Sequence, residues 1–298
     1  MSDPEANREE PRSTSRLPEG PGRLLVDLAL SLGLAALVPV ASLLSIVPGI
    51  WLQPETRPRP IDHGSVPPCD AVLCTERKFR WRSDFREWRT SLAFPESWVY
   101  RSIAEDNAAA ARASRSRPGN DVAYWSAIYQ RAAAENWPRT APLAEVFAGI
   151  AAANRLDRAA TLRMVVSFAQ SLPYAVPENY LQLYVPPRLI EQGRGDCDSR
   201  ALFLYLVLSR LGYRATVLIS PHYAHAMVGV ECGGCGGERF DGPDGRRYSF
   251  IETTARTPPG FLHPAVREHE RWHSVPRCAD DRGCAQALSD PDDPPARP

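Results

Sequence analysis

Hydrophobic and polar residues follow different patterns along the chain, and the first clear pattern is a long apolar run near its beginning. Twenty consecutive residues from Leu28 to Val47 carry no charge. A helix of about 20 residues rises about 30 Å, which matches the hydrocarbon core of a bilayer. Trp51 follows at a position typical of an interfacial residue. The pattern predicts one membrane-spanning helix within residues 23–52.

A cleaved signal peptide and a buried core helix are the alternatives for this apolar run. The apolar part of a signal peptide is shorter, and no small-x-small cleavage site follows the run. Four arginines lie within residues 8–23, and two more lie within residues 57–59. Because positive residues favour the cytoplasmic side, we expect a cytoplasmic N-terminus and a domain on the extracytoplasmic side of the cytoplasmic membrane.

Composition divides the rest of the chain. Residues 1–22 are polar, which predicts a disordered tail, and residues 53–68 are proline-rich, which predicts an extended linker. Residues 69–284 have the composition of a globular domain. Residues 285–298 are again polar and proline-rich, and we expect a second disordered tail.

The hydrophobic period changes within residues 69–284. Helical spacing predicts one helix from Asp121 to about Asn136, a second over residues 143–154, and a third that begins after Asp157. An irregular stretch is expected around residues 186–187, which are both proline. Strand-like patterns then cover residues 213–220, 224–232 and 247–254, separated by glycine-rich turns. Helices followed by antiparallel strands predict an α+β domain.

Composition and charge narrow the classes of function. Of the 298 residues, 44% are hydrophobic, so the chain can bury a substantial core. The 35 basic residues balance the 35 acidic ones, and the formal net charge is +0. Proteins that bind a nucleic-acid backbone carry a basic excess, so we expect no nucleic-acid partner.

The segment GRGDCDSRALFLYLVLSRLGY places a cysteine where a helix begins. The residues after Cys197 predict an apolar helix of about 14 residues, which Gly212 is suited to end. Unpaired N–H groups at a helix N-terminus stabilise a thiolate and can bind an oxyanion. The carboxylates of Asp196 and Asp198 disfavour a thiolate, unless they cap the helix and point away from the sulfur. Cys197 is a candidate nucleophile, although a cysteine at a helix start is more often structural.

Two further residues supply the groups that a thiol nucleophile needs. His225 begins the predicted strand HAMVGV, and Glu252 lies near the end of another, in FIETT. A thiol needs a base, and an imidazole base needs a carboxylate or amide that fixes its tautomer. Cysteine, histidine and acid occur in an order that fits these three roles.

These segments together carry a resemblance to a known family. GDCDSRALFLYLVLSRLGYRATVL, HAMVGV and YSFIETT resemble the transglutaminase-like superfamily of papain-fold cysteine enzymes, especially its bacterial and archaeal cysteine-peptidase group. The upstream segment VVSFAQSLPYAVPENY is similar to the one that precedes the cysteine in those proteins. The resemblance covers residues 160–262 and implies a papain-like, transglutaminase-like core. It also implies Cys197 as nucleophile, His225 as general base and Glu252 as the acid that orients the histidine.

The chain departs from the superfamily at two of these positions. Glu252 stands where aspartate is common, and Met227 stands where tryptophan is common. Neither change removes a group that the reaction requires, but both leave the substrate class open.

Other residues compete for the same roles. His222 competes with His225, but only His225 begins the regular apolar strand. Asp241 and Asp244 compete with Glu252, although they lie in the turn-like sequence DGPDG, where they suit backbone geometry. Two more residues, Gln192 and Tyr174, are candidates for oxyanion stabilisation or substrate positioning.

The seven cysteines form three close pairs and leave one over. The pairs are Cys69/Cys74, Cys232/Cys235 and Cys278/Cys284, and the remaining cysteine is Cys197. Short loops bring such partners within disulfide distance, so we expect three local bridges in an oxidising compartment. A Cys2His2 zinc site that combines the CxxC pair with His222 and His225 is the alternative, but it would consume the expected base.

The sequence predicts a membrane-anchored cysteine hydrolase, a peptidase or amidase that acts through a thioester on an extracytoplasmic protein or wall substrate. An amine acceptor in place of water would make the protein a protein-glutamine transamidase. A non-catalytic interaction module with the same fold is the alternative from another class. No cofactor and no metal are expected, and residues 24–52 would provide the membrane contact.

Overall fold

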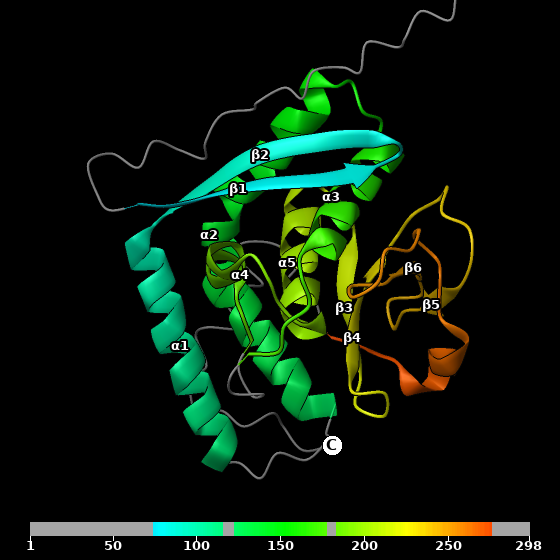
Figure 1. The fold of residues 1–298 in the computed structure, drawn as a ribbon. Coiled ribbons are helices and arrows are strands. Elements are labelled where there is room, and N and C mark those ends of the chain that lie inside the picture. The colour runs from blue at the N-terminus through cyan, green and yellow to red at the C-terminus, as the bar shows by residue number, and fades with distance from the viewer. Residues whose placement is uncertain (1–73, 116–121, 178–182, 276–298) are drawn as a thin grey trace, which may run out of the picture. The chain divides into compact units, whose positions relative to one another are not determined.

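A computed structural model describes three stretches of the chain, residues 74–115, 122–177 and 183–275 (Figure 1). All three belong to one unit of the chain, which spans residues 57–298. Within the described stretches, five α-helices and two antiparallel sheets form an α+β fold, as the sequence predicts.

A two-stranded antiparallel hairpin begins the described region. It consists of β1 (Cys74–Ser83) and β2 (Arg86–Pro95). Apolar and polar residues alternate in both strands, so the hairpin buries one face and exposes the other. The buried face includes Trp81, Trp88, Leu92 and Phe94. The sequence predicted a helical first half for this domain, and the hairpin corrects that expectation, because its period-two pattern is typical of strands.

A long helix, α2 (Val122–Ala153), follows α1 (Glu96–Arg115) and corrects a second expectation. The sequence predicted two helices here, with a break before residue 143, but α2 continues through Pro138 and Pro142. Each proline removes one helical hydrogen bond, which usually ends or bends a helix. Burial of the surrounding turns against the core, including Trp137, compensates for this loss.

Three shorter helices follow, and the last of them is central to the fold. Asp157 caps α3 (Arg158–Ser171) by accepting a hydrogen bond from the backbone of Ala160, as predicted. The stretch expected to be irregular instead forms α4 (Pro186–Gln192), because proline fits the first turn of a helix. Next comes α5 (Cys197–Arg210), which is wholly buried from residue 201 to 208 and lies between α2 and the larger sheet (Figure 1).

The larger sheet has five strands, and each neighbouring pair is antiparallel. Its order is β5 (Arg239–Asp241), β6 (Arg247–Ile251), β4 (His225–Val230), β3 (Ala215–Ser220) and β7 (His273–Ser274). Three of these strands were predicted, whereas β5 and β7 were not. One face of the sheet packs against α5, and the other covers a small second core around Phe250 and Trp272. Two 3-10 helices, Pro264–Val266 and His269–Arg271, precede β7 and lie beside this second core.

The predicted membrane span and both predicted tails lie outside the described residues, as does the predicted linker. No helix within the stretches that the structure describes is both long and apolar enough to cross a bilayer.

Candidate active site

The structure places the three predicted site residues at the ends of three different elements. Cys197 is the first residue of α5, His225 is the first residue of β4, and Glu252 directly follows β6. Cys197 and Glu252 are buried, whereas His225 is half-buried. Because β4 pairs with β6 and packs against α5, these three element ends are held in one region of the fold.

His225 and Glu252 are in direct contact. Nε2 of His225 lies 3.2 Å from Oε1 and 3.3 Å from Oε2 of Glu252. A carboxylate is a hydrogen-bond acceptor, so this contact favours the tautomer with the proton on Nε2. The Nδ1 atom is then the nitrogen that can accept a proton. Trp272 packs against the imidazole, with 6.0 Å between the ring centroids, and restricts its rotation.

Glu252 is itself fixed by the backbone that follows it. Its Oε1 atom accepts hydrogen bonds from the backbone N–H groups of Thr253 and Thr254 and from the Thr254 hydroxyl, at 2.7–2.8 Å. Burial disfavours the charged form, but the hydrogen bond to His225 and those from Thr254 lower the pKa of Glu252 to about 2. Glu252 is therefore ionised at neutral pH and keeps a fixed orientation.

Cys197 lies close to this pair through the backbone of β4. The Cys197 sulfur interacts with the backbone of Ala226, the residue after His225, and this interaction lowers the pKa of the thiol. Burial, followed by the charges of Asp198 and Asp196, outweighs it, so the pKa of Cys197 is raised well above its ordinary value. The sequence indicated two opposing effects on this thiol, and in the structure burial and the aspartate charges outweigh the stabilisation of a thiolate by the helix N-terminus. The thiol is neutral at physiological pH.

The two aspartates beside Cys197 have different roles. Asp196 caps α5 by accepting a hydrogen bond from the backbone of Ser199 at 3.0 Å. This agrees with the alternative, raised by the sequence, that an aspartate beside Cys197 caps the helix. Burial and the charge of Asp198 raise the pKa of Asp196 to about 6. Asp198 does not point away, because its carboxylate accepts a hydrogen bond from the Cys197 thiol at 3.5 Å and another from the Tyr129 hydroxyl at 2.7 Å.

A buried arginine joins the segments around Cys197. Arg200 lies one helical turn after Cys197 and is 0% exposed. Its Nη1 donates to the carbonyl of Thr253 at 2.8 Å, and its Nη2 donates to the carbonyl of Leu172 at 2.7 Å. Its guanidinium also lies 5.6 Å from the centroid of the Tyr174 ring. Arg200 thus links the nucleophile helix to the end of β6 and to the chain that follows α3.

Two other buried contacts keep the residues around Glu252 in place. The Gln170 side-chain amide donates to the carbonyl of Glu252 at 2.9 Å, and the Thr253 hydroxyl donates to the carbonyl of Ala226 at 2.8 Å. Gln170, Thr253 and Arg200 were not among the residues that the sequence patterns indicated. A polar residue on an otherwise apolar buried helix face was the available signal for Gln170 and Arg200.

The competing residues occupy other places. His222 is exposed in the turn before β4, and its ring packs on Tyr223. Asp241 is exposed and pairs with Arg247, at 3.6 Å, rather than with His225. Asp244 accepts a hydrogen bond from the Tyr248 hydroxyl at 2.7 Å.

The two candidate positioning residues also differ. Tyr174 lies at the site, because it forms a backbone bridge with Gly195. Burial is the main cause that raises the pKa of Tyr174, and the nearby Cys197 is the next. The amide of Gln192 donates to its neighbour Glu191 at 2.6 Å. Tyr174 is 56% exposed, so it can contact a ligand that approaches Cys197.

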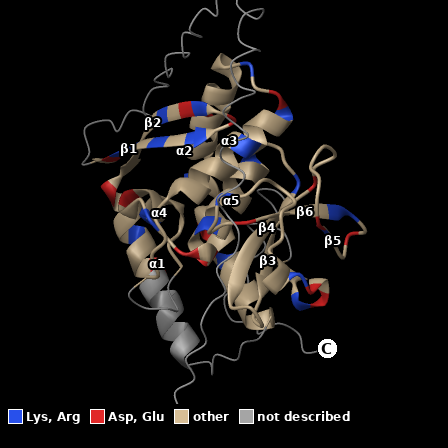
Figure 2. Cartoon of the chain, turned by 45° about the vertical axis from the view of Figure 1, so that its right-hand side comes forward, with Lys and Arg blue, Asp and Glu red and all other residues tan. Residues whose placement is uncertain are grey.

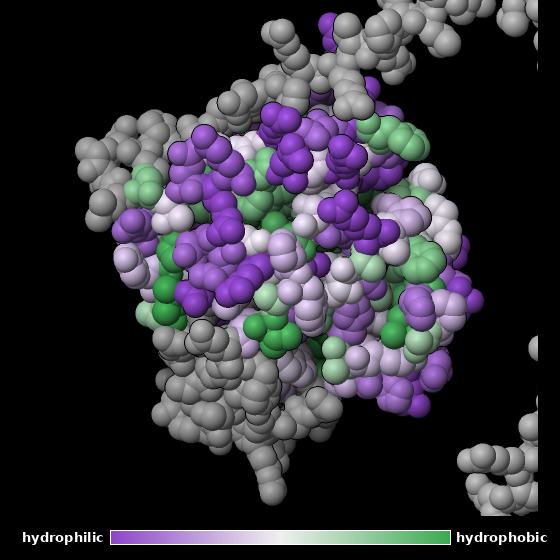
Figure 3. Space-filling model, in the orientation of Figure 1, coloured by the Kyte–Doolittle hydropathy of each residue, from purple (hydrophilic) through white to green (hydrophobic). Residues whose placement is uncertain are grey.

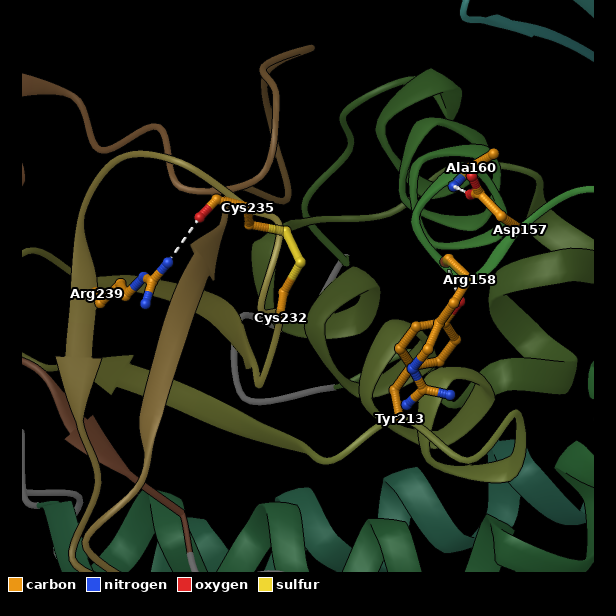
Figure 4. The surroundings of a disulfide bond; sticks show 7 residues. All are labelled: Asp157, Arg158, Ala160, Tyr213, Cys232, Cys235 and Arg239. Carbon is orange, nitrogen blue, oxygen red and sulfur yellow. Dashed lines mark hydrogen bonds between the residues drawn. A yellow bond between two sulfur atoms is a disulfide. The ribbon is translucent and has the colours of Figure 1, made fainter.

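The CxxC pair forms a disulfide, as predicted. Cys232 and Cys235 are bonded, and the backbone carbonyl of Cys235 accepts a hydrogen bond from Arg239 at 2.9 Å (Figure 4). The zinc alternative does not fit this state, because both sulfurs are already used. Cys197 is a free, buried thiol.

The other two predicted bridges involve cysteines outside the described residues. Cys74 is disulfide-bonded, and its partner lies outside the described residues. The predicted Cys278/Cys284 pair also lies outside them.

No family model, curated protein or solved structure matches the chain. Among the described residues, no group of three or more histidine, cysteine or acidic side chains is arranged to hold a metal ion. The chemistry of the site must therefore be inferred from its own residues and their geometry.

Proposed function

We propose that the protein is a membrane-anchored, transglutaminase-like cysteine hydrolase that cleaves a peptide or amide bond in an extracytoplasmic protein or wall substrate. The observation that carries the proposal is the 3.2 Å contact between His225 and Glu252, next to a strand residue whose backbone interacts with the Cys197 sulfur. A nucleophile, a base and an acid that orients the base are the groups that acyl transfer requires. The papain-like core, the anchor and the extracytoplasmic location rest on the sequence.

The proposed reaction begins with attack of the Cys197 sulfur on the carbonyl carbon of the substrate. Nδ1 of His225 takes the thiol proton and then passes it to the leaving amine, so that a thioester forms on Cys197. Water attacks the thioester with His225 as base, which releases the acid and restores the thiol. Glu252 stabilises the imidazolium that forms in each step, because it is ionised and in contact with Nε2.

The state of the free thiol determines the order of the first events. Because burial and Asp198 raise the pKa of Cys197, the free protein holds a neutral thiol. Proton transfer to His225 must then accompany the attack on the carbonyl rather than precede it. A substrate that separates the Asp198 carboxylate from the sulfur would make this transfer easier.

A second candidate is a non-catalytic interaction module. The observation that favours it is the burial of Cys197, which is 5% exposed, together with its raised pKa. A module of this kind has no need to keep a base and an orienting acid together, whereas His225 and Glu252 do lie together. We therefore favour the enzyme.

Labelling of the full chain with iodoacetamide separates the two candidates. In the enzyme, alkylation of Cys197 depends on His225, so His225→Ala should slow it by about a hundredfold, at the lower end of general-base effects. His222→Ala is the matched control, because this histidine is exposed and lies three residues away, and it should leave the rate unchanged. Cys197→Ala should abolish the signal. Equal rates in His225→Ala and the unaltered protein would support the module instead.

A further inference from the structure

The β1–β2 turn and the loop between α2 and α3 line an open pocket away from the proposed chemistry. The pocket has a volume of about 320 Å³. Its lining includes Asp84, Arg86, Arg155, Asp157 and Arg163. None of these residues belongs to the candidate active site, so the pocket needs an explanation of its own.

The charges that line the pocket leave two arginines for a ligand. Both carboxylates already have partners. Asp84 accepts hydrogen bonds from Nε of Arg163 at 2.8 and 3.0 Å, and Asp157 caps α3 through the backbone of Ala160. Within the described stretches, the side chains of Arg86 and Arg155 pair with no carboxylate. The pocket therefore offers two guanidinium groups to an anion.

Unusual backbone conformations gather at the same place. Four described non-glycine residues have positive φ angles, and three of them lie at this pocket or its turn. They are Asp84 at 46°, Phe85 at 61° and Arg155 at 50°. Glycine is the preferred residue at such positions, because it alone adopts them without steric cost. The chain instead places a large aromatic and a cationic side chain there, which is typical of a functional site.

Phe85 is the most exposed large hydrophobic residue of the described chain. It lies at the tip of the hairpin, between the pocket residues Asp84 and Arg86, and its relative exposure is 110%. Figure 3 shows apolar, light green surface beside purple, hydrophilic surface at the end of the molecule where the β1–β2 turn lies. Basic residues also follow both strands of the hairpin toward this turn (Figure 2). An exposed apolar side chain next to Arg86, at a pocket that Arg155 also lines, suits an interface between hydrocarbon and phosphate.

We propose that the hairpin tip docks on an anionic phospholipid surface. Phe85 enters the boundary between headgroups and acyl chains, and Arg86 and Arg155 bind a lipid phosphate at the mouth of the pocket. Guanidinium groups match phosphate geometry better than any other side chain, and basic residues bind anionic bilayers through the same charge attraction.

The chain outside the described residues supports a lipid rather than a protein partner. The predicted membrane span ends near residue 52, and β1 begins at Cys74. The residues between them can extend to roughly 70 Å, about twice the length of a ten-residue strand. The hairpin tip can therefore reach the bilayer that holds the span, and the tether raises the effective concentration of that surface.

The test compares hydrogen exchange at the hairpin tip in two bilayers. The full chain is placed in lipid discs of phosphatidylcholine, or of phosphatidylcholine mixed with phosphatidylglycerol, and exchange is followed at residues 84–87 and 155. We expect slower exchange only where phosphatidylglycerol is present. Each basic residue near an anionic surface contributes about a factor of five in binding, so Arg86→Ser with Arg155→Ser should weaken the binding that gives the protection by about 25-fold.

Phe85→Gly provides the sharpest variant, because glycine suits the positive φ at this position and the fold should not suffer. It should lose the protection while keeping the thermal stability of the unaltered chain. Arg247→Ser, which changes an exposed arginine on β6, is the matched control and should keep the protection. Equal exchange in the two bilayers, or protection that survives Phe85→Gly, would overturn the proposal.

Discussion

Replacing Arg200 with methionine tests whether this residue joins the parts of the candidate site. The side chain is fully buried and donates to the carbonyls of Thr253 and Leu172 at 2.8 and 2.7 Å. Methionine fills a similar volume but donates no hydrogen bond. Two buried carbonyls would therefore lose their charged donor, and the carboxylates of Asp196 and Glu252 would lose a nearby cation.

The magnitude follows from these losses. A hydrogen bond to a charged group contributes roughly 1.5–3 kcal/mol to stability, so two such bonds amount to about 3–6 kcal/mol. Part of this loss of stability is offset, because burial of the guanidinium itself carries a desolvation cost that methionine avoids. We expect Arg200→Met to lower the free energy of unfolding by about 3–5 kcal/mol, which is a large share of the stability of a typical domain.

Urea unfolding of the full chain, followed by tryptophan fluorescence, measures this change. Arg200→Lys keeps the charge but cannot reach both carbonyls, so its loss should be smaller. Arg247→Met is the matched control, because Arg247 is exposed and its ion pair with Asp241 is weak, at 3.6 Å. If Arg200→Met unfolded at the same urea concentration as this control, the linking role of Arg200 would be refuted.

Three further predictions concern the thiol, the acid and the disulfide. Asp198→Asn should lower the pKa of Cys197, because it removes a carboxylate that accepts from the thiol, and the pH profile of Cys197 alkylation should move to lower pH. Because the pKa of Glu252 is lowered to about 2, its stabilising effect is complete above its unfolded pKa and lost as pH falls toward 2. Glu252→Gln should therefore destabilise the fold at pH 7 and have little effect near pH 2, measured by unfolding at both. Non-reducing peptide mapping should find Cys232 bonded to Cys235 and Cys197 free, and a bridge to Cys197 would contradict the nucleophile assignment.

Local sequence patterns were sufficient where a single segment determines its own structure. The apolar run after Cys197 predicted α5, and Asp157 predicted the start of α3, because a cap and a helical period depend only on nearby residues. The apolar run that forms β4 placed His225 at a strand end. The period-two pattern of β1 and β2 is also local and is typical of strands, although helices were expected there.

Local patterns failed where packing outweighed backbone preference. Pro138 and Pro142 indicated a break, yet α2 continues because its buried face packs along α5. Proline costs a hydrogen bond locally, but the burial of a whole helix face is a larger, non-local term. The sequence of this segment alone does not show that burial of the helix face outweighs the hydrogen bonds lost at the two prolines.

The sequence by itself determined which residues are available for chemistry and at which element ends they lie: Cys197, His225 and Glu252. Only the tertiary structure decided how they interact. It brought Glu252 against His225, placed Asp198 against the thiol, and buried Arg200 between segments that are distant in the chain. The physical reason is that the pKa of a thiol depends on its burial and on nearby charges. Asp196 and Asp198 are sequence neighbours of Cys197, but the burial of the thiol and the direction in which these carboxylates point are set by packing among helices and strands.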